Sequence, residues 1–222
     1  FENNVDFEIA NGCTLDVGNS LVDGSLGLFS VNSGGTLKTT HVNGIALSGP
    51  TGSIQTTSRY FSFAGNYQYY ATGPQATGNG IPSPLNGKLI IGSTGSTTNL
   101  TLTNGSVTMN GTLILCSSSS SYSTIVSGTV AYGTTGTLEY QGLSGQTSTN
   151  KEWPVASPPP NVNINNGFGV IMNGDRTIQG MLTLSQGNLS IGLYTLTLNG
   201  ALTKNMGGLN GGTGSNITLG GT

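Results

Sequence analysis

Acidic residues are the first groups in this chain that could do chemistry, because glycoside hydrolysis needs two carboxylates facing one cleft. Five of the eight acidic residues lie within the first 23 positions: Glu2, Asp6, Glu8, Asp16 and Asp23. Strand alternation places Asp6 and Glu8 on the same outward face. That segment holds no Lys, Arg or His, and Lys38 is the nearest base. We therefore expect a solvated acidic face and no catalytic pair, with a weak calcium site as the alternative.

Histidine and cysteine are too sparse for a catalytic triad or a zinc site. His41 is the only histidine, and no nucleophile-elbow motif accompanies it. Cys13 and Cys116 are far apart, fit no metal or redox spacing, and are expected to be small buried side chains. One His and two distant Cys do not complete a tetrahedral shell. We expect no enzymatic activity, no metal and no cofactor.

A glycine-rich stretch at residues 211–217 resembles a calcium-binding nonapeptide repeat. Asn216 stands where that repeat has its ligand Asp, and no tandem copy follows. Two glycine-rich corners are therefore favoured over a calcium site.

Aromatic residues cluster more strongly than the charged ones. Six of the 15 lie within 11 positions, namely Tyr60, Phe61, Phe63, Tyr67, Tyr69 and Tyr70. Exposed tyrosine and tryptophan rings can form a sugar-binding platform, and the candidates for it are Tyr67, Tyr69, Tyr70, Tyr140 and Trp153. The alternative is that Phe61 and Phe63 point into the core while the tyrosines stack in a ladder along a sheet.

A proline-rich stretch follows the only tryptophan. Trp153 precedes Pro154, and three further prolines occupy positions 158–160. Because proline cannot join a hydrogen-bonded ladder, this stretch is predicted to be an exposed contact loop.

The elements that must position these residues are short strands. Apolar and polar residues alternate in many places, and no glycine-free helical period occurs. Leu182, Leu189 and Leu196 recur every seven residues, with Gly and Asn between them. Three strands and three corners give a coil of about 21 residues. The sequence predicts an all-β fold, a right-handed and roughly triangular parallel β-helix of about ten coils and roughly 45 to 50 Å.

A longer repeat overlies the short one. Residues 104–115 align without gaps on residues 173–184, and upstream Tyr70, Gln75 and Pro82 correspond to Tyr140, Gln146 and Pro154. No change of composition marks a linker. We expect a single solenoid segment over 1–222, with modules at about 1–65 (partial), 66–135, 136–204 and 205–222, the last being the start of a further coil.

Composition restricts the partners. The formal net charge is −2, and only six basic residues are scattered over 222 positions. That pattern offers no stripe for a phosphate backbone and no basic amphipathic helix, and no apolar run is long enough to span a bilayer. Neither nucleic acid binding nor membrane insertion is expected. The scarcity of Lys and Glu beside abundant Thr, Ser, Asn and Gly is typical of a secreted surface protein.

Several motifs resemble the strand-repeat regions of large secreted and surface proteins of Bacteroidetes-type bacteria. They are Gly-Ser-Ile-Gln at 52–55, Asn-Tyr-Gln-Tyr at 66–69, the Gly- and Pro-containing stretch 77–82, Asn-Leu-Thr-Leu at 99–102, and residues 104–115. The resemblance implies a repetitive β-rich shaft and an extracellular or cell-surface location.

We accordingly expect a non-catalytic structural shaft or adhesive segment of a large extracellular protein. The alternative is a carbohydrate-binding module that uses the exposed tyrosine and tryptophan side chains. The expected partners are adjoining coils of the same longer chain or end-to-end copies, because neither end shows a polar cap, together with surface glycans contacted weakly at many points.

Overall fold

The chain folds as a parallel β-solenoid of about nine turns. The structure is a computed structural model that describes residues 5–25 and 27–220, where all regular secondary structure is β-strand. Each pairing between the named strands is parallel. The predicted all-β solenoid is thus confirmed. No helix in the described ranges is long and apolar enough to cross a membrane.

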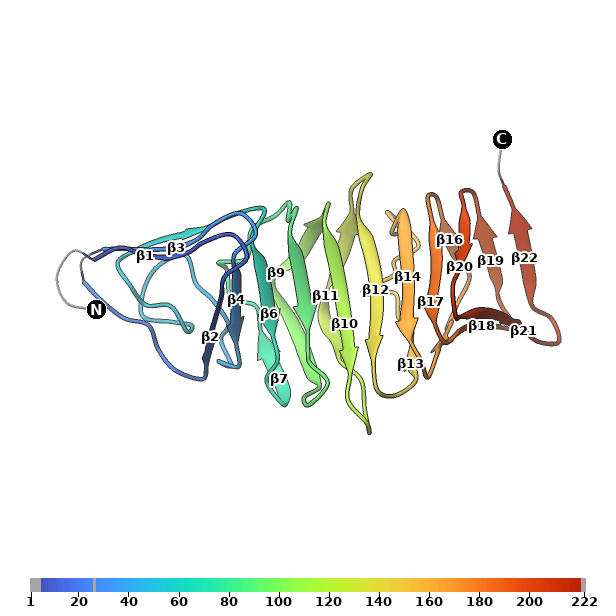
Figure 1. The fold of residues 1–222 in the computed structure, drawn as a ribbon, viewed down its shortest axis with the longest axis horizontal. Coiled ribbons are helices and arrows are strands. Elements are labelled where there is room, and N and C mark those ends of the chain that lie inside the picture. The colour runs from blue at the N-terminus through green and yellow to red at the C-terminus, as the bar shows by residue number, and fades with distance from the viewer. Residues whose placement is uncertain (1–4, 26, 221–222) are drawn as a thin grey trace.

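One sheet, the spine sheet, runs through the coils from one end to the other (Figure 1). Its strands lie side by side in the order β2 (Thr14–Gly18), β4 (Thr36–Thr39), β6 (Asn66–Tyr69), β8 (Lys88–Ile91), β10 (Thr112–Ser117), β12 (Thr137–Gly142), β14 (Asn161–Asn166), β17 (Leu182–Gln186) and β20 (Leu202–Lys204).

The other faces of the solenoid are divided among four shorter sheets. The first contains β1 (Phe7–Ile9), β3 (Leu28–Val31) and β5 (Ser58–Phe61). The second contains β7 (Gly73–Ala76), β9 (Thr98–Met109) and β11 (Thr124–Tyr132). The third contains β13 (Gln146–Thr147), β15 (Val170–Ile171), β18 (Asn188–Gly192) and β21 (Gly208–Gly211). The fourth contains β16 (Arg176–Ile178), β19 (Thr195–Leu198) and β22 (Asn216–Leu219).

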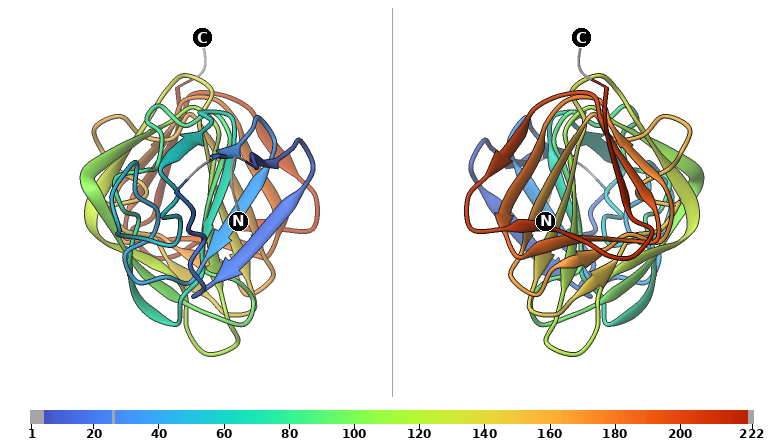
Figure 2. Two further views of the ribbon diagram at one scale, coloured as in Figure 1. Left: turned by 90° about the vertical axis from the view of Figure 1, so that its left-hand side faces the viewer. Right: turned by 90° about the vertical axis from the view of Figure 1, so that its right-hand side faces the viewer.

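The seven-residue spacing corresponds to the faces of one coil. Leu182, Leu189 and Leu196 are fully buried, and they lie in β17, β18 and β19, which belong to three different sheets. Figure 2 shows the resulting three-sided outline at the C-terminal end. Alternation turns each leucine inward, while the glycine and asparagine between them form the corners.

Coil length varies more than the sequence predicted. Val162, Leu182 and Leu202 are register partners in successive coils and lie 20 residues apart. Leu37 and Tyr67 are also register partners, yet they lie 30 residues apart. Longer corners consume residues without adding a coil, so the spine sheet has nine strands where about ten coils were expected.

The core is a set of columns that run along the axis. The longest column joins the register partners Leu15, Leu37, Tyr67, Leu89, Leu113, Leu138, Val162, Leu182 and Leu202. The seven inner members of that column are at most 1% exposed. Each coil therefore covers the apolar side chains of the coil before it, and no coil buries its own side chains alone.

The two cysteines lie in different surroundings, and both are free thiols. Cys116 is buried as expected, and burial raises the pKa of its thiol to about 11, with the charge of Glu139 adding to the rise. Cys13 is exposed, so the prediction that it is buried was wrong. It lies at a corner directly before β2, where side chains are not forced inward.

Candidate functional site

Four of the five aromatic residues proposed as a sugar-binding platform are inside the protein. The exposed fractions are 1% for Tyr67 and Tyr140 and 0% for Tyr69 and Trp153. An exposed platform made of these rings is therefore wrong. The physical reason is strand parity, because each tyrosine occupies an inward position of a spine strand. Tyr69 and Tyr140 fall in one column, whereas the sequence comparison had matched Tyr140 with Tyr70.

The buried tyrosines do not form the ladder that was the alternative. Tyr67 packs edge-on against Phe61, which is in the core as expected, and Tyr140 packs against Trp153. Phe63 was also expected in the core but is 51% exposed. The hydroxyls of these tyrosines are satisfied internally, as in Tyr67, which donates to the Ser62 carbonyl at 2.8 Å. These rings fill the core and leave no face for a ligand.

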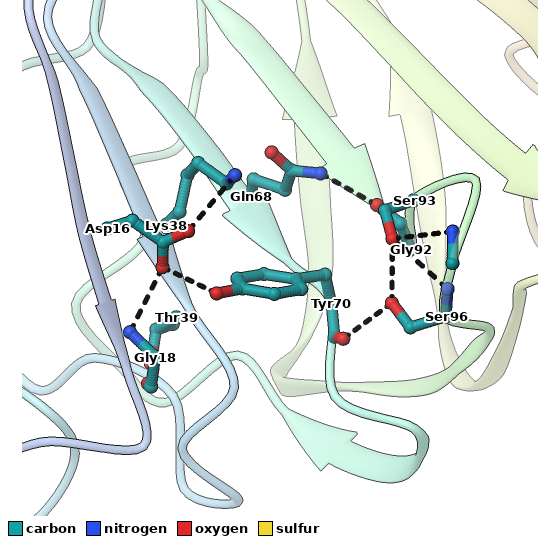
Figure 3. Close-up of polar contacts among 10 residues, drawn as sticks. Asp16, Gly18, Lys38, Thr39, Gln68, Tyr70, Gly92, Ser93 and Ser96 are labelled. Carbon is teal, nitrogen blue, oxygen red and sulfur yellow. Dashed lines mark hydrogen bonds and ion pairs between the residues drawn. The ribbon is translucent and has the colours of Figure 1, made fainter.

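Tyr70 is the one member of the set near the surface, where it belongs to a cluster that joins three coils (Figure 3). Its hydroxyl donates to Asp16 Oδ1 at 2.5 Å, and Lys38 Nζ lies 3.1 Å from Asp16 Oδ2. The Lys38 ammonium also lies 4.9 Å from the centre of the Tyr70 ring. Each polar group is thus paired within the cluster, which connects successive coils on the outer surface.

Electrostatics fixes the charge states of this cluster. Partial burial raises the pKa of Asp16, but hydrogen bonds from Tyr70, Lys38 and Gly18 outweigh it, and the net pKa is lowered. Desolvation and the bond to Asp16 raise the pKa of Tyr70 to about 12. At neutral pH the cluster therefore contains an ionised carboxylate and a neutral phenol. Neither group titrates near pH 7, where a general acid or base is most effective.

The acidic residues near the N-terminal end also connect coils. Asp6 Oδ1 accepts a hydrogen bond from the Leu28 backbone at 2.8 Å, and Glu8 Oε1 accepts one from the Asn32 amide. His41 uses Nδ1 to accept from the Asn43 backbone at 3.2 Å. Glu2 lies outside the described residues. Within residues 5–25 and 27–220, no group of three or more His, Cys, Asp or Glu could hold a metal ion.

A buried polar cluster around Glu152 was not predicted. Glu152 is 1% exposed, and its carboxylate accepts hydrogen bonds from the Tyr140 hydroxyl at 3.0 Å and from the backbone and hydroxyl of Thr149. Burial raises its pKa, and these hydrogen bonds only partly oppose the rise. In sequence Glu152 sits between Lys151 and Trp153 at the start of a proline-rich loop, a context that suggested exposure.

Arg176 extends this cluster toward the surface. It is 3% exposed, and its guanidinium donates to Asn150 Oδ1 at 2.8 Å and to Asn173 Oδ1. The guanidinium carbon lies 5.8 Å from the centre of the Trp153 ring. Arg176 Nε and Trp153 Nε1 are buried and have no hydrogen-bond partner among the described residues.

A pocket of about 480 Å³ borders this guanidinium. The proline-rich loop and residues of the next two coils line it together, among them Asn150, Pro154, Val155, Asp175, Thr177 and Thr197. The predicted contact loop does reach the surface at Val155, which is 76% exposed. Its tryptophan, in contrast, is buried at the base of the loop.

The pocket exists because the loop takes the place of a strand. Backbone N–H groups of Val130 and Tyr132 in β11 donate to the carbonyls of Lys151 and Ser157 in the loop. The sheet containing β11 therefore ends here, and a separate sheet begins with β16. Sequence reasoning had no signal for this pocket, because its walls come from three segments that are 15 or more residues apart, namely 150–158, 173–177 and 195–197.

Comparison with protein-family models, with curated proteins and with solved structures found no match for this chain. The class of protein is therefore defined by the fold, a repetitive parallel β-solenoid.

Proposed function

We propose that this chain is a non-catalytic shaft segment of a large extracellular or cell-surface protein, of the kind suggested by its resemblance to Bacteroidetes-type strand repeats. The observation that supports this most directly is the spine sheet, whose nine parallel strands continue without a break along the long axis. Reach and stiffness are the properties that such a sheet supplies. In this proposal the shaft has no cofactor, and adhesion comes from many shallow contacts along its side.

Stiffness follows from how the coils are joined. Backbone hydrogen bonds connect each spine strand to the strands of the neighbouring coils, so bending the rod must distort many of them at once. Side-chain bonds add to this along the corners, for example Asn110 to Asn86 at 2.9 Å and Asn199 to Gln179 at 2.7 Å.

The last coil presents an apolar end surface, defined here as Leu202, Ile217 and Leu219. Their exposed fractions are 47%, 49% and 78%, although Leu202 continues the buried column of Val162 and Leu182. The strands β20, β21 and β22 are also the edge strands of their sheets. We infer that an adjoining coil of the same longer chain covers this surface, since a further coil would continue both the column and the ladder.

A distance measurement tests the shaft. Cys13, which is exposed and directly precedes β2, can carry one spin label, and a Thr203→Cys variant can carry a second on β20. Nine strands give eight intervals, so at about 4.8 Å each the labels should lie roughly 40 Å apart. Pulsed electron paramagnetic resonance should show one narrow distance distribution. A broad or much shorter distribution would contradict a stiff shaft.

Two further measurements test the context. Antibodies against the segment should label intact, unpermeabilised cells of the source organism, and labelling only after permeabilisation would contradict a surface location.

In the full-length polypeptide, the backbone amides of β22 should exchange slowly with deuterium if an adjoining coil covers them. Fast exchange there would contradict a covering coil. Protection that accompanies self-association of the chain, where Leu219→Asp abolishes both and Leu193→Asp abolishes neither, would instead indicate end-to-end copies. Leu193 is a matched control at 77% exposure.

A further inference from the structure

We propose that the pocket beneath the proline-rich loop binds a neutral sugar residue of a glycan through its adjacent hydroxyl groups. This site uses none of the aromatic residues singled out from the sequence, and it does not depend on the shaft proposal. Its volume of about 480 Å³ is within the range of about 300–1,000 Å³ that small-molecule sites have.

The loop that forms one wall is held in place from below. Trp153 is completely buried at its base, and the Tyr132 hydroxyl donates to the Glu152 carbonyl at 2.7 Å. Ser157 has a φ of 58°, in the left-handed region that a residue with a side chain adopts only when its surroundings require it. The wall is therefore fixed in its conformation before a ligand arrives, which lowers the entropic cost of binding.

Hydrogen-bonding groups on the pocket wall match a sugar diol. Asp175 Oδ1 accepts from the Thr195 backbone at 2.8 Å, while no bond to a described residue uses its Oδ2. Asn150 and Asn173 direct their carbonyl oxygens to Arg176, so their amide N–H groups stay free of partners in the described part of the chain. A carboxylate can accept from two adjacent hydroxyls, while amide groups donate to the hydroxyl oxygens.

Two further features make the pocket complementary to a sugar ring. The hydroxyls of Thr177 and Thr197, register partners on β16 and β19, have no partner among the described residues and line the pocket beside Asp175. Val155 and Pro154 on the loop give an apolar surface for the C–H face of a sugar ring. A polar floor with an apolar wall suits a ring that has hydroxyls on its edge and C–H groups on its face.

Charge distinguishes neutral from acidic sugars. Arg176 is the only cation among the described residues that line the pocket. The carboxylate of Asp175 lies beside it in the lining, and the buried Glu152 is close enough to interact with it electrostatically. One guanidinium with two carboxyl groups gives no net positive potential. A uronic acid would therefore meet repulsion from Asp175, and the charge of Arg176 is already balanced by the two carboxyl groups.

Ligand-observed NMR and calorimetry on the whole chain test the proposal. The probes are the methyl glycosides of glucose, galactose, mannose and N-acetylglucosamine, with methyl glucuronide as the acidic comparison. We expect at least one neutral glycoside to bind more tightly than the glucuronide. The double variant Thr177→Val/Thr197→Val should weaken that binding by about 5- to 10-fold or more, the effect of losing about one hydrogen bond.

A matched control comes from the spine sheet. Thr183 and Thr203 are also register partners in successive coils, but they lie on a different face, so Thr183→Val/Thr203→Val should leave binding unchanged. Absence of binding by every probe, preference for the glucuronide, or equal loss in the control variant would overturn the proposal. None of these outcomes alters the spin-label distance along the spine, so failure of the sugar site and failure of the shaft are distinguishable.

Discussion

Replacing Trp153 should separate the contribution of packing from the cost of a buried donor without a partner. The Trp153 ring is 0% exposed and lies 6.5 Å from the Tyr140 ring, centre to centre. Its Nε1–H is buried without a hydrogen-bond partner in the described structure. Alanine removes both the packing and the donor, whereas phenylalanine removes the donor and only a small part of the packing.

The two variants are therefore expected to differ widely in stability. Trp153→Ala should lower the free energy of unfolding by about 3–5 kcal/mol, as large-to-small changes in cores do. Trp153→Phe loses a smaller apolar area, worth about 1–2 kcal/mol, but it also removes an unsatisfied donor whose burial costs about 1–3 kcal/mol. The net change for phenylalanine should lie within about 1 kcal/mol of zero.

Denaturant unfolding should be followed by circular dichroism, because Trp153 is the only tryptophan and its fluorescence disappears in both variants. Tyr140→Phe is the matched control, since its hydroxyl is bonded to Glu152 and its loss should cost about 1–3 kcal/mol. If Trp153→Phe proves as destabilising as Trp153→Ala, the indole N–H has a partner, and the reasoning about an unsatisfied donor is wrong.

Three other predictions address charge, backbone and thiol chemistry. Burial raises the pKa of Glu152, so the stability advantage of Glu152→Gln over the natural chain should grow as pH rises from 4 to 8 in urea unfolding; a shrinking advantage contradicts this. Gly78→Ala should cost more than about 2 kcal/mol in thermal unfolding because its Cβ would collide with the neighbouring coil, whereas Gly12→Ala, with φ of 77° and open space, should cost about 1 kcal/mol. Thiol titration should find Cys13 reactive in the folded chain and Cys116 reactive only after unfolding, and two reactive thiols in the folded state would refute the burial of Cys116.

Local patterns were sufficient to predict the solenoid but not its dimensions. The alternation around Leu182, Leu189 and Leu196 is a property of each strand, so the sequence displays it directly. Coil length depends on how many residues each corner holds, and corners have no period. The 30-residue separation of Leu37 and Tyr67 therefore appears only when the register of the strands is known.

The error over the aromatic residues has a similar origin. In the run from Asn66 to Tyr70, tyrosines occupy positions of both parities, so composition alone leaves the buried face undecided. The signal that could have settled it is the alternation of Asn66 and Gln68 with Tyr67 and Tyr69, the same polar and apolar pattern that identified the leucine strands. Only Tyr70, which follows the end of β6, escapes the core.

Predicting the pocket would have required the contacts between coils, which no local sequence pattern contains. Arg176 meets Asn150, which is 26 residues earlier, while Asp175 meets Thr195, which is 20 residues later. Unequal coil lengths make these separations unpredictable from a fixed repeat. The burial of Glu152 was equally hidden, because a charged residue beside prolines is ordinarily exposed, and only the replacement of a strand by the loop places it in the core.

The faces of the solenoid differ in a way that would let one chain combine the proposed shaft with the proposed sugar site. The loop interrupts a side face, where the sheet ending with β11 gives way to the sheet beginning with β16, but β12 and β14 remain paired over six register positions in the same region of the spine. A load along the axis can therefore pass through the spine while the interruption leaves room for a pocket. A solenoid broken on all its faces at one level would lose its stiffness there, and one continuous on all of them would have no recess for a ligand.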